Sequence, residues 1–209
     1  MKTRTPLQIL SYPEYLKLRE NATVIEADQH GDKVLRLPDG SYLKFFRRKR
    51  LLSSALLYPY AVRFADNLDA LHQRGIPCPT QIAAYRIAAI SRDAIHYAPL
   101  EGKTLRQVLK EAKGNPDMAQ LRSALGEFVA DLHQAGIYFR SLHLGNIVLT
   151  STGQLGLIDV SDLVPHHRPL GRMQRARNMK HMLRYPAETA WLGLDDAFQT
   201  AYDRRSLGR

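Results

Sequence analysis

Short segments with alternating apolar and polar residues mark the first half of the chain. Residues 23–27, 33–37 and 41–46 each have the composition and period of a β-strand, and turn-forming residues separate them. Consecutive strands joined by tight turns pair as neighbours, so this part predicts a three-stranded antiparallel meander. Two more strand-like segments follow at residues 84–87 and 94–97.

Helical spacing replaces this alternation elsewhere. Phe64, Leu68 and Leu71 recur on one face of a predicted helix between the third and fourth strands. Two more helices are predicted after the candidate N-cap residues Thr104 and Asp117, because short polar side chains satisfy the first free N–H groups of a helix.

A hairpin interrupts the helical half of the chain at residues 146–149 and 155–159, and the remainder is again helical. A small sheet with one helix, then a linker, then a mostly helical region is the order of an α+β protein, not of repeated βαβ units. The predicted parts are an N-terminal arm, a sheet lobe and a helical lobe: residues 1–22, 23–100 and 101–209.

The composition is that of an ordinary globular protein, with 209 residues, 44% hydrophobic and 24% charged. Cys78 is the one cysteine, so no disulfide can form within the chain, and a reducing compartment is expected. We see no signal-peptide pattern and no apolar run near the length of about 18 residues that a membrane span needs. These features predict a cytoplasmic protein.

The charge is strongly positive, with 30 Lys and Arg against 20 Asp and Glu. Residues 165–185 contribute many of the basic side chains and contain no Asp or Glu. A solvated helix face is the ordinary interpretation of such a run, but an anionic partner is also favoured. An anionic membrane surface fits best. Nucleic acid fits less well because this stretch lacks aromatic residues for base stacking up to Arg184, so an RNA-binding helper remains a weaker alternative.

Three residues carry candidate chemistry. Lys44 lies within a predicted strand, although it could simply alternate outward to solvent. Asn146, where a loop meets a strand, offers a hard oxygen ligand for Mg²⁺, or it could serve only as a turn residue. Asp159 ends an apolar strand, where a carboxylate is costly unless it is paired or bound to a metal, or it could be a capping residue. A lysine and two oxygen donors together suggest a clamp for a magnesium nucleotide.

The segment from residue 132 to residue 159, which includes these two oxygen donors, resembles the protein-kinase-like superfamily, and residues 74–79 match its helix-to-strand junction. The nearest branch is the bacterial lipopolysaccharide kinases, which phosphorylate core sugars (heptose or Kdo). The chain is also similar to short Gram-negative proteins labelled toluene-tolerance proteins. The resemblance covers about residues 23–185. It implies a compact kinase-like fold of two lobes, ATP and Mg²⁺ as cofactors, and a lipid-linked anionic saccharide as partner at the cytoplasmic face of the inner membrane.

The resemblance also implies roles for single residues. Lys44 would hold the α- and β-phosphates of ATP, and the turn that contains Gly31 would lie over the phosphates. Asn146 and Asp159 would bind Mg²⁺. Arg140 would order the catalytic loop.

Two positions depart from the family pattern. Ser141 stands where the superfamily has the aspartate that accepts the proton of the substrate hydroxyl. The predicted helix that should supply a glutamate partner for Lys44 offers the shorter Asp66. His143 could act as the base instead, although a turn residue without a role is the simpler interpretation. The sequence therefore leaves two functions open, a phosphotransferase or a pseudokinase that binds or regulates without transfer. It leaves the oligomeric state open as well.

Overall fold

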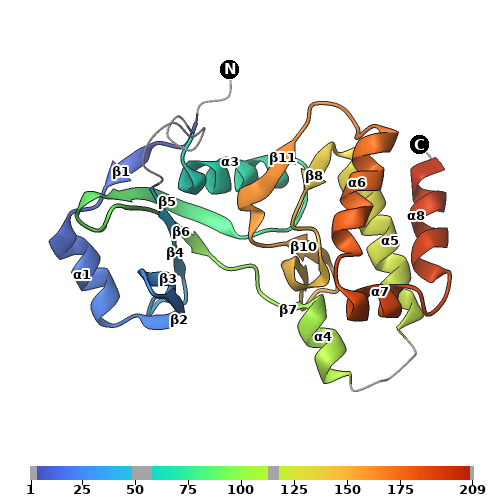
Figure 1. Ribbon diagram of the computed structural model, residues 1–209, viewed down its shortest axis with the longest axis horizontal. Coiled ribbons are helices and arrows are strands. Elements are labelled where there is room, and N and C mark those ends of the chain that lie inside the picture. The colour runs from blue at the N-terminus through green and yellow to red at the C-terminus, as the bar shows by residue number, and fades with distance from the viewer. Residues whose placement is uncertain (1–3, 49–57, 113–117, 208–209) are drawn as a thin grey trace. The chain divides into compact units, whose positions relative to one another are not determined.

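The computed structural model describes residues 4–48, 58–112 and 118–207. The chain divides into two compact units, Met1–Leu100 and Glu101–Arg209. Strands and helices occur in both units, so the predicted α+β class is confirmed (Figure 1).

The first unit is built on a six-stranded sheet with the order β1-β5-β6-β4-β3-β2. Its strands are β1 (Leu7–Ile9), β2 (Thr23–Asp28), β3 (Gly31–Arg36), β4 (Tyr42–Arg47), β5 (Thr80–Ile87) and β6 (Arg92–Ala98). The five predicted strands all form and pair antiparallel. The sheet is mixed, however, because β1 adds to β5 in parallel. This strand comes from the segment predicted as a separate arm.

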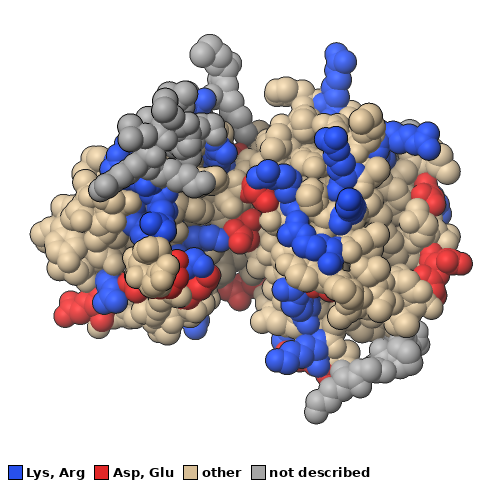
Figure 2. All heavy atoms as spheres, in the orientation of Figure 1, with Lys and Arg blue, Asp and Glu red and all other residues tan. Residues whose placement is uncertain are grey.

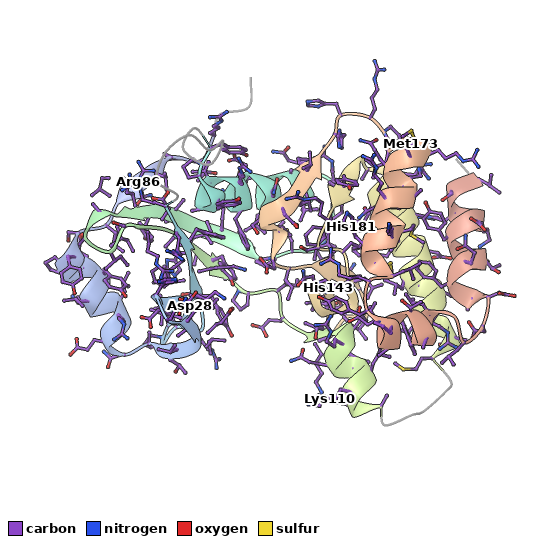
Figure 3. All side chains as sticks on the ribbon, viewed as in Figure 1. Asp28, Arg86, Lys110, His143, Met173 and His181 are labelled. Atoms are coloured by element: carbon purple, nitrogen blue, oxygen red, sulfur yellow. The ribbon has the colours of Figure 1, made fainter. Side chains whose placement is uncertain are left out.

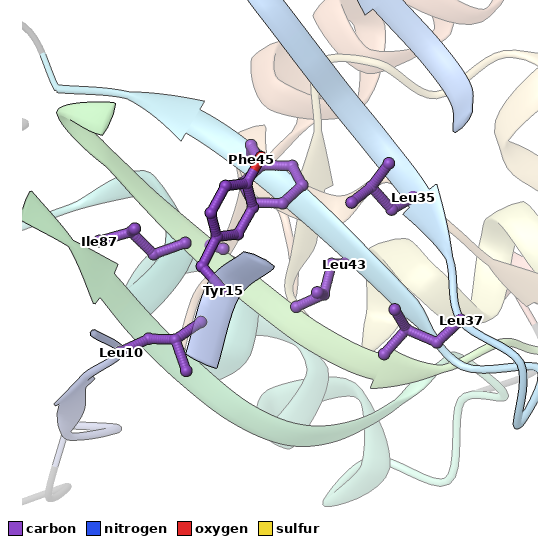
Figure 4. Close-up of a cluster of buried hydrophobic side chains, with 8 residues drawn as sticks. Leu10, Tyr15, Leu35, Leu37, Leu43, Phe45 and Ile87 are labelled. Carbon is purple, nitrogen blue, oxygen red and sulfur yellow. The ribbon is translucent and has the colours of Figure 1, made fainter. Parts of the chain in front are cut away.

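Alternation along the strands gives this sheet two different faces. One face is covered by α1 (Tyr12–Glu20). This helix begins with a capping box between Ser11 and Glu14. Figure 4 shows the buried cluster there, in which Tyr15 of α1 meets the edge of the Phe45 ring with centroids 5.9 Å apart. The cluster consists of Leu10, Tyr15, Leu35, Leu37, Leu43, Phe45, Ile87 and Ala94.

The opposite face of the sheet carries α3 (Tyr60–His72). Phe64, which is 1% exposed, lies 6.3 Å from the ring of Phe46 on β4 and 5.5 Å from the ring of Tyr97 on β6. The predicted helix face of Phe64, Leu68 and Leu71 is fully buried.

The second unit is mainly helical. Its helices are α4 (Leu105–Glu111), α5 (Ala119–Gln134), α6 (Arg172–Met182), α7 (Pro186–Leu192) and α8 (Ala197–Leu207), and α8 packs along α5 (Figure 1). Thr104 caps α4 as predicted, through a capping box with Gln107. Met118 holds the N-cap position of α5, and Asp117 lies outside the described residues.

Two small sheets complete the second unit. β7 (Lys103–Thr104), β9 (Ile147–Leu149) and β10 (Leu155–Leu157) form one, and β8 (Ile137–Phe139) pairs with β11 (Leu163–Pro165) in the other. The antiparallel pair β9–β10 is the predicted hairpin. Among the helices that the structure describes, none combines the length and apolar composition needed to cross a membrane.

Candidate functional site

Lys44 lies in the middle of a central strand of the first unit. It pairs with Val34 on β3 and Ile95 on β6, and its side chain is on the face opposite to buried Leu43 and Phe45. Its Nζ lies 6.0 Å from the ring centroid of Phe46 and 5.8 Å from that of Phe64. The lysine is therefore half-buried against aromatic rings, and it does not simply project from the sheet into solvent.

Gly31 is the residue where the β2–β3 turn enters β3. Its φ of +108° is a conformation that residues with a side chain rarely adopt. Arg92, 6% exposed, holds this turn from β6: it donates to the carbonyl of His30 over 2.6 Å and to that of Asp32 over 3.4 Å. The buried Arg92 guanidinium therefore holds this turn in place, and the sequence analysis did not select it.

Asp66, the proposed partner of Lys44, lies on α3. Its Oδ1 accepts hydrogen bonds from the backbone and the hydroxyl of Thr5, both over 3.0 Å, and its Oδ2 accepts from the Tyr58 hydroxyl over 2.8 Å. The carboxylate therefore ties α3 to the start of the chain. Asn67, the next residue, is 4% exposed and lies one helical turn from Phe64, whose ring approaches Lys44.

In the second unit, the loop after β8 and the β9–β10 hairpin bring Asn146 and the residues before Asp159 together. The backbone N–H of Ile158 donates to the carbonyl of Asn146 over 3.0 Å. The side-chain NH₂ of Asn146 donates to the carbonyl of Ser141 over 2.9 Å. Because the NH₂ group makes this bond, the carbonyl oxygen Oδ1 is the atom of Asn146 that a metal ion would use.

Asp159 has a strained backbone. Its φ of 53° and ψ of 48° lie in the left-handed region, where aspartate is tolerated better than most residues but still at a cost. Such conformations persist where the surrounding structure imposes them, and they concentrate at functional sites. The Asp159 side chain makes no capping hydrogen bond to the 3₁₀ turn that follows it.

Ser141 is joined to an acid that the sequence analysis did not select. Its hydroxyl donates to Oδ2 of Asp162 over 2.7 Å. Asp162 ends the 3₁₀ turn Val160–Asp162 that follows Asp159, and the pairing of Leu163 with Phe139 brings it beside the loop after β8. The other carboxylate oxygen, Oδ1, is buried and has no hydrogen-bond partner in the described part of the chain.

His143, which Figure 3 labels, has its Nε2 3.4 Å from the Asn146 amide nitrogen. Burial, and then the nearby Arg106 guanidinium, lower the pKa of the His143 ring. Its Nδ1 is buried without a hydrogen-bond partner among the described residues. This surrounding favours a neutral ring that holds the asparagine in place.

Glu188 of α7 also binds this loop. It is 5% exposed, and it accepts hydrogen bonds from the backbone N–H of Leu144 over 3.0 Å and from Arg106 Nε over 2.7 Å. A side chain at Gly145 would come within 2.9 Å of the Arg106 guanidinium, so glycine permits this close approach. Glu188 and Arg106 are 82 residues apart in sequence, and no local pattern could have linked them.

Asn178 of α6 and His133 of α5 support the start of the loop. Asn178 is 1% exposed; its NH₂ donates to the carbonyl of Phe139 over 2.6 Å, and its Oδ1 lies 3.3 Å from His133 Nε2. His133 Nδ1 is 2.8 Å from the Tyr202 hydroxyl. Burial, with a smaller contribution from Arg175, lowers the pKa of His133 to about 4.

Arg140 is exposed, and its carbonyl accepts a hydrogen bond from Arg184 over 3.4 Å. A basic surface continues along α6, where Figure 2 shows Lys and Arg side chains gathered. We call it the α6 basic face; its residues are Arg172, Arg177, Lys180 and Arg184, all exposed.

A cavity of about 650 Å³ opens next to the loop, between α4 and α7. Arg106 and Glu188, which hold the loop, also line it, together with the apolar side chains of Leu109, Met118 and Trp191.

Residues 16–202 match the family model described as Lipopolysaccharide kinase (Kdo/WaaP) family. The chain belongs to this family. The family resemblance and the kinase-like fold predicted from the sequence are thereby confirmed. Comparison with curated protein sequences found no match.

The donor set of this lipopolysaccharide kinase family member fits a magnesium nucleotide better than a metal held by protein alone. Asn146 and Asp159 offer hard oxygen atoms, which Mg²⁺ prefers. Among the described residues, no group of three or more His, Cys, Asp or Glu could hold a metal ion. Phosphate oxygens of a nucleotide would have to complete the coordination, as is usual for Mg²⁺ in phosphotransfer enzymes. Lys44 belongs to the first unit, so its meeting with these two residues stays a prediction.

Proposed function

We propose that the protein is an ATP- and Mg²⁺-dependent phosphotransferase that acts on a core sugar of lipopolysaccharide. The observation that carries the proposal is the β9–β10 hairpin, in a member of this family. In this hairpin the N–H of Ile158 donates to the carbonyl of Asn146, one of the two predicted metal ligands. Ile158 directly precedes the other, Asp159, whose backbone is in a strained conformation.

Each predicted residue has one task in this reaction. Lys44 holds the nucleotide phosphates, and the anchored turn at Gly31 covers them. Asn146 and Asp159 would hold Mg²⁺, which neutralises charge on the phosphates when it is bound. His143 keeps the Asn146 side chain oriented, and Arg140 contributes positive charge at the edge of the loop.

Nucleotide binding is the first test. Calorimetry with the purified full chain is expected to show ATP binding that strengthens with Mg²⁺. Asp159→Asn should remove the Mg²⁺ dependence, because a neutral amide replaces the charged ligand. No binding by the wild-type protein at millimolar nucleotide would overturn the proposal.

Lys44 has a matched control in the same sheet. Lys33 on β3 has a side chain that is 41% exposed, and it pairs with Glu26. We expect Lys44→Met to weaken ATP binding at least about 10-fold, the effect of losing about 1.4 kcal/mol of phosphate contact. Lys33→Met should leave it unchanged. Equal effects of the two substitutions would show that the loss is one of general charge.

Transfer is the second test, and it separates the two functions that the sequence leaves open. Labelled ATP and purified lipopolysaccharide precursor should yield a phosphorylated saccharide, in a reaction lost in Asp159→Asn. Binding of MgATP without any transfer would instead support a pseudokinase, for which Ser141 at the position of the base is the specific argument.

We also propose that the α6 basic face attaches the protein to the anionic inner face of the cytoplasmic membrane, where a lipid-linked acceptor would be found. Basic residues near an anionic leaflet contribute about 1 kcal/mol each. Met173, 74% exposed on the same helix, adds an apolar side chain that could enter the headgroup region (Figure 3).

Sedimentation with vesicles tests the membrane contact. Binding to vesicles containing phosphatidylglycerol should fall about 100-fold when Arg172, Arg177 and Lys180 are changed to Glu, and vesicles of phosphatidylcholine alone should not bind. The control changes three exposed basic residues on other elements, Lys17, Arg36 and Lys103. An equal loss in the control would mean that net charge, not this face, is responsible, and tighter binding to RNA than to vesicles would favour a nucleic-acid partner.

A further inference from the structure

We propose that Asp162 replaces the missing catalytic aspartate, working as the proton acceptor behind Ser141. The inference rests on the proposed phosphotransfer function and names the group that would accept the proton in that reaction. In it, the acceptor hydroxyl gives its proton to Ser141 Oγ while the Ser141 hydroxyl gives its own proton to Asp162.

The first argument is the contact itself. The Ser141 hydroxyl donates to Asp162 Oδ2 over 2.7 Å, a short hydrogen bond of the kind formed with a charged acceptor. A serine alone has no useful basicity near neutral pH, whereas a serine hydrogen-bonded to a carboxylate can take up one proton as it releases another. Both side chains are half-buried, and Ser141 stands at the position where the family resemblance places the group that meets the substrate hydroxyl.

The second argument is the unsatisfied oxygen of Asp162. Its Oδ1 is buried and accepts no hydrogen bond from any residue that the structure describes. A carboxylate that only tied two loops together would be expected to have both oxygens satisfied, because a buried unpaired acceptor is costly. A carboxylate with this unused capacity is suited to accept a proton.

The third argument is placement relative to the metal ligands. Asp162 follows Asp159 by one 3₁₀ turn, and Ser141 is bound through its carbonyl to the Asn146 side chain over 2.9 Å. The pairing of β11 with β8 keeps the two segments in register, with Leu163 opposite Phe139. The serine–aspartate pair is therefore built into the same hairpin and loop that carry the two oxygen donors.

His143 is less suited to this task. Its Nε2 faces the Asn146 amide, its Nδ1 is buried, and burial lowers the pKa of the ring. These contacts fit a positioning role for His143 and leave the Ser141–Asp162 pair as the proton acceptor.

The bonds of the reaction balance with ATP as the donor. The acceptor oxygen forms a bond to the γ-phosphorus, and the bond from that phosphorus to the bridging oxygen of ADP breaks. The proton of the acceptor hydroxyl moves to Ser141 Oγ, and the proton that Ser141 carried moves to Asp162. Asp162 becomes a neutral acid and later loses this proton to water. ADP leaves with the electron pair of the broken bond.

The test compares phosphate transfer by Asp162→Asn with transfer by Asp203→Asn. Asp203 is an exposed acid on α8 in the same unit, so it is a matched control. We expect Asp162→Asn to lower kcat by about 10²- to 10⁴-fold, the usual contribution of a general base, with little change in ATP affinity. Asp203→Asn should keep wild-type activity.

An exchange of the two residues distinguishes proton transfer from support of the loop. The double variant Ser141→Asp, Asp162→Ser keeps a serine–aspartate pair but returns the carboxylate to the catalytic loop. Recovery of at least about 10-fold over Asp162→Asn would support the inference. A folded exchange variant that binds MgATP but transfers no faster than Asp162→Asn would overturn it.

The outcomes also separate this inference from the proposed function. If the wild-type protein transfers phosphate and Asp162→Asn does so at the same rate, only the role of Asp162 is wrong. If the wild-type protein binds no nucleotide, the phosphotransferase proposal fails, and this inference fails with it.

Discussion

The strand that carries Lys44 and the loop that carries Asn146 are stabilised in different ways. Leu43 and Phe45, on either side of Lys44, are buried in an apolar cluster under α1. The loop after β8 is held by buried polar groups instead, with Asn178 on the Phe139 carbonyl and Glu188 on the Leu144 N–H. Apolar packing positions a strand because every second side chain enters the core. Hydrogen bonds position a loop through individual donor and acceptor groups, each of which must be present.

The strand should therefore be most sensitive to a loss of apolar volume. Phe45 is 5% exposed and packs against Tyr15. We expect Phe45→Ala to lower the free energy of unfolding by about 4 kcal/mol, through lost burial and the cavity left behind. Urea denaturation followed by circular dichroism measures this loss. Val24→Ala on β2, where the side chain is 45% exposed, is the control, and a loss there as large as that of Phe45→Ala would contradict the importance of the cluster.

The loop should be most sensitive to the loss of a buried amide. Asn178→Ala leaves the Phe139 carbonyl and His133 Nε2 without their partner. We expect a loss of about 3 kcal/mol in the free energy of unfolding, since each buried group left unsatisfied costs about 1–3 kcal/mol. Trp191, the one tryptophan, lies on α7 and reports on the second unit by fluorescence.

The control for Asn178 is Gln199→Ala on α8. Gln199 is exposed, and among the residues that the structure describes its amide donates to Asp203 alone, so its removal should cost under about 0.5 kcal/mol. Similar losses in the two variants would show that buried polar contacts do not hold the loop.

The same contrast explains which features could be predicted from the sequence. The strands around Lys44 and the β9–β10 hairpin were predicted because their apolar alternation and turn residues are local. The parallel pairing of β1 with β5 was missed, since its two strands are far apart along the chain.

The candidate site divides in the same way. Lys44, Asn146 and Asp159 were predicted from their positions at strands and from the family resemblance, and their shared role stays a prediction. Asp162, Glu188 and Asn178 were not, because they act over separations of 21, 44 and 39 residues, respectively. No periodicity or short motif carries that information, and only the folded chain brings such partners together.

Acid should weaken the polar support of the loop before it affects the apolar cluster. Burial lowers the pKa of His133 to about 4, while in the unfolded chain its pKa returns to about 6.5. The unfolded state therefore binds the proton first, and stability is lost as the pH falls from about 6.5 toward 4. Between pH 7 and pH 5 this one group should cost about 2 kcal/mol.

Unfolding measured by Trp191 fluorescence at pH 7, 6 and 5 checks this effect. His133→Gln should flatten the dependence by about 2 kcal/mol. His72→Gln, at an exposed position on α3, is the control and should leave it unchanged. An equally steep dependence in His133→Gln would assign the acid sensitivity to other groups, of which His143 and His181 in the same unit also have lowered pKa values through burial.

The smallest effect distinguishes an ion pair with a buried carboxylate from an ion pair that is exposed on both sides, within the second unit. Glu188 has a side chain 7% exposed and pairs with Arg106, whereas Glu111 is 57% exposed and pairs with Lys103. Glu188→Gln keeps one acceptor oxygen, so either the Leu144 N–H or Arg106 loses its bond, at a cost of about 1–2 kcal/mol. Glu111→Gln should cost less than about 0.5 kcal/mol, because an exposed pair is screened by solvent.

Added salt at 1 M should remove the small effect of Glu111→Gln and leave most of that of Glu188→Gln, since buried pairs are screened less. Equal salt sensitivity would mean that Glu188 acts as a surface charge and that the loop is held by Asn178 and His143 instead.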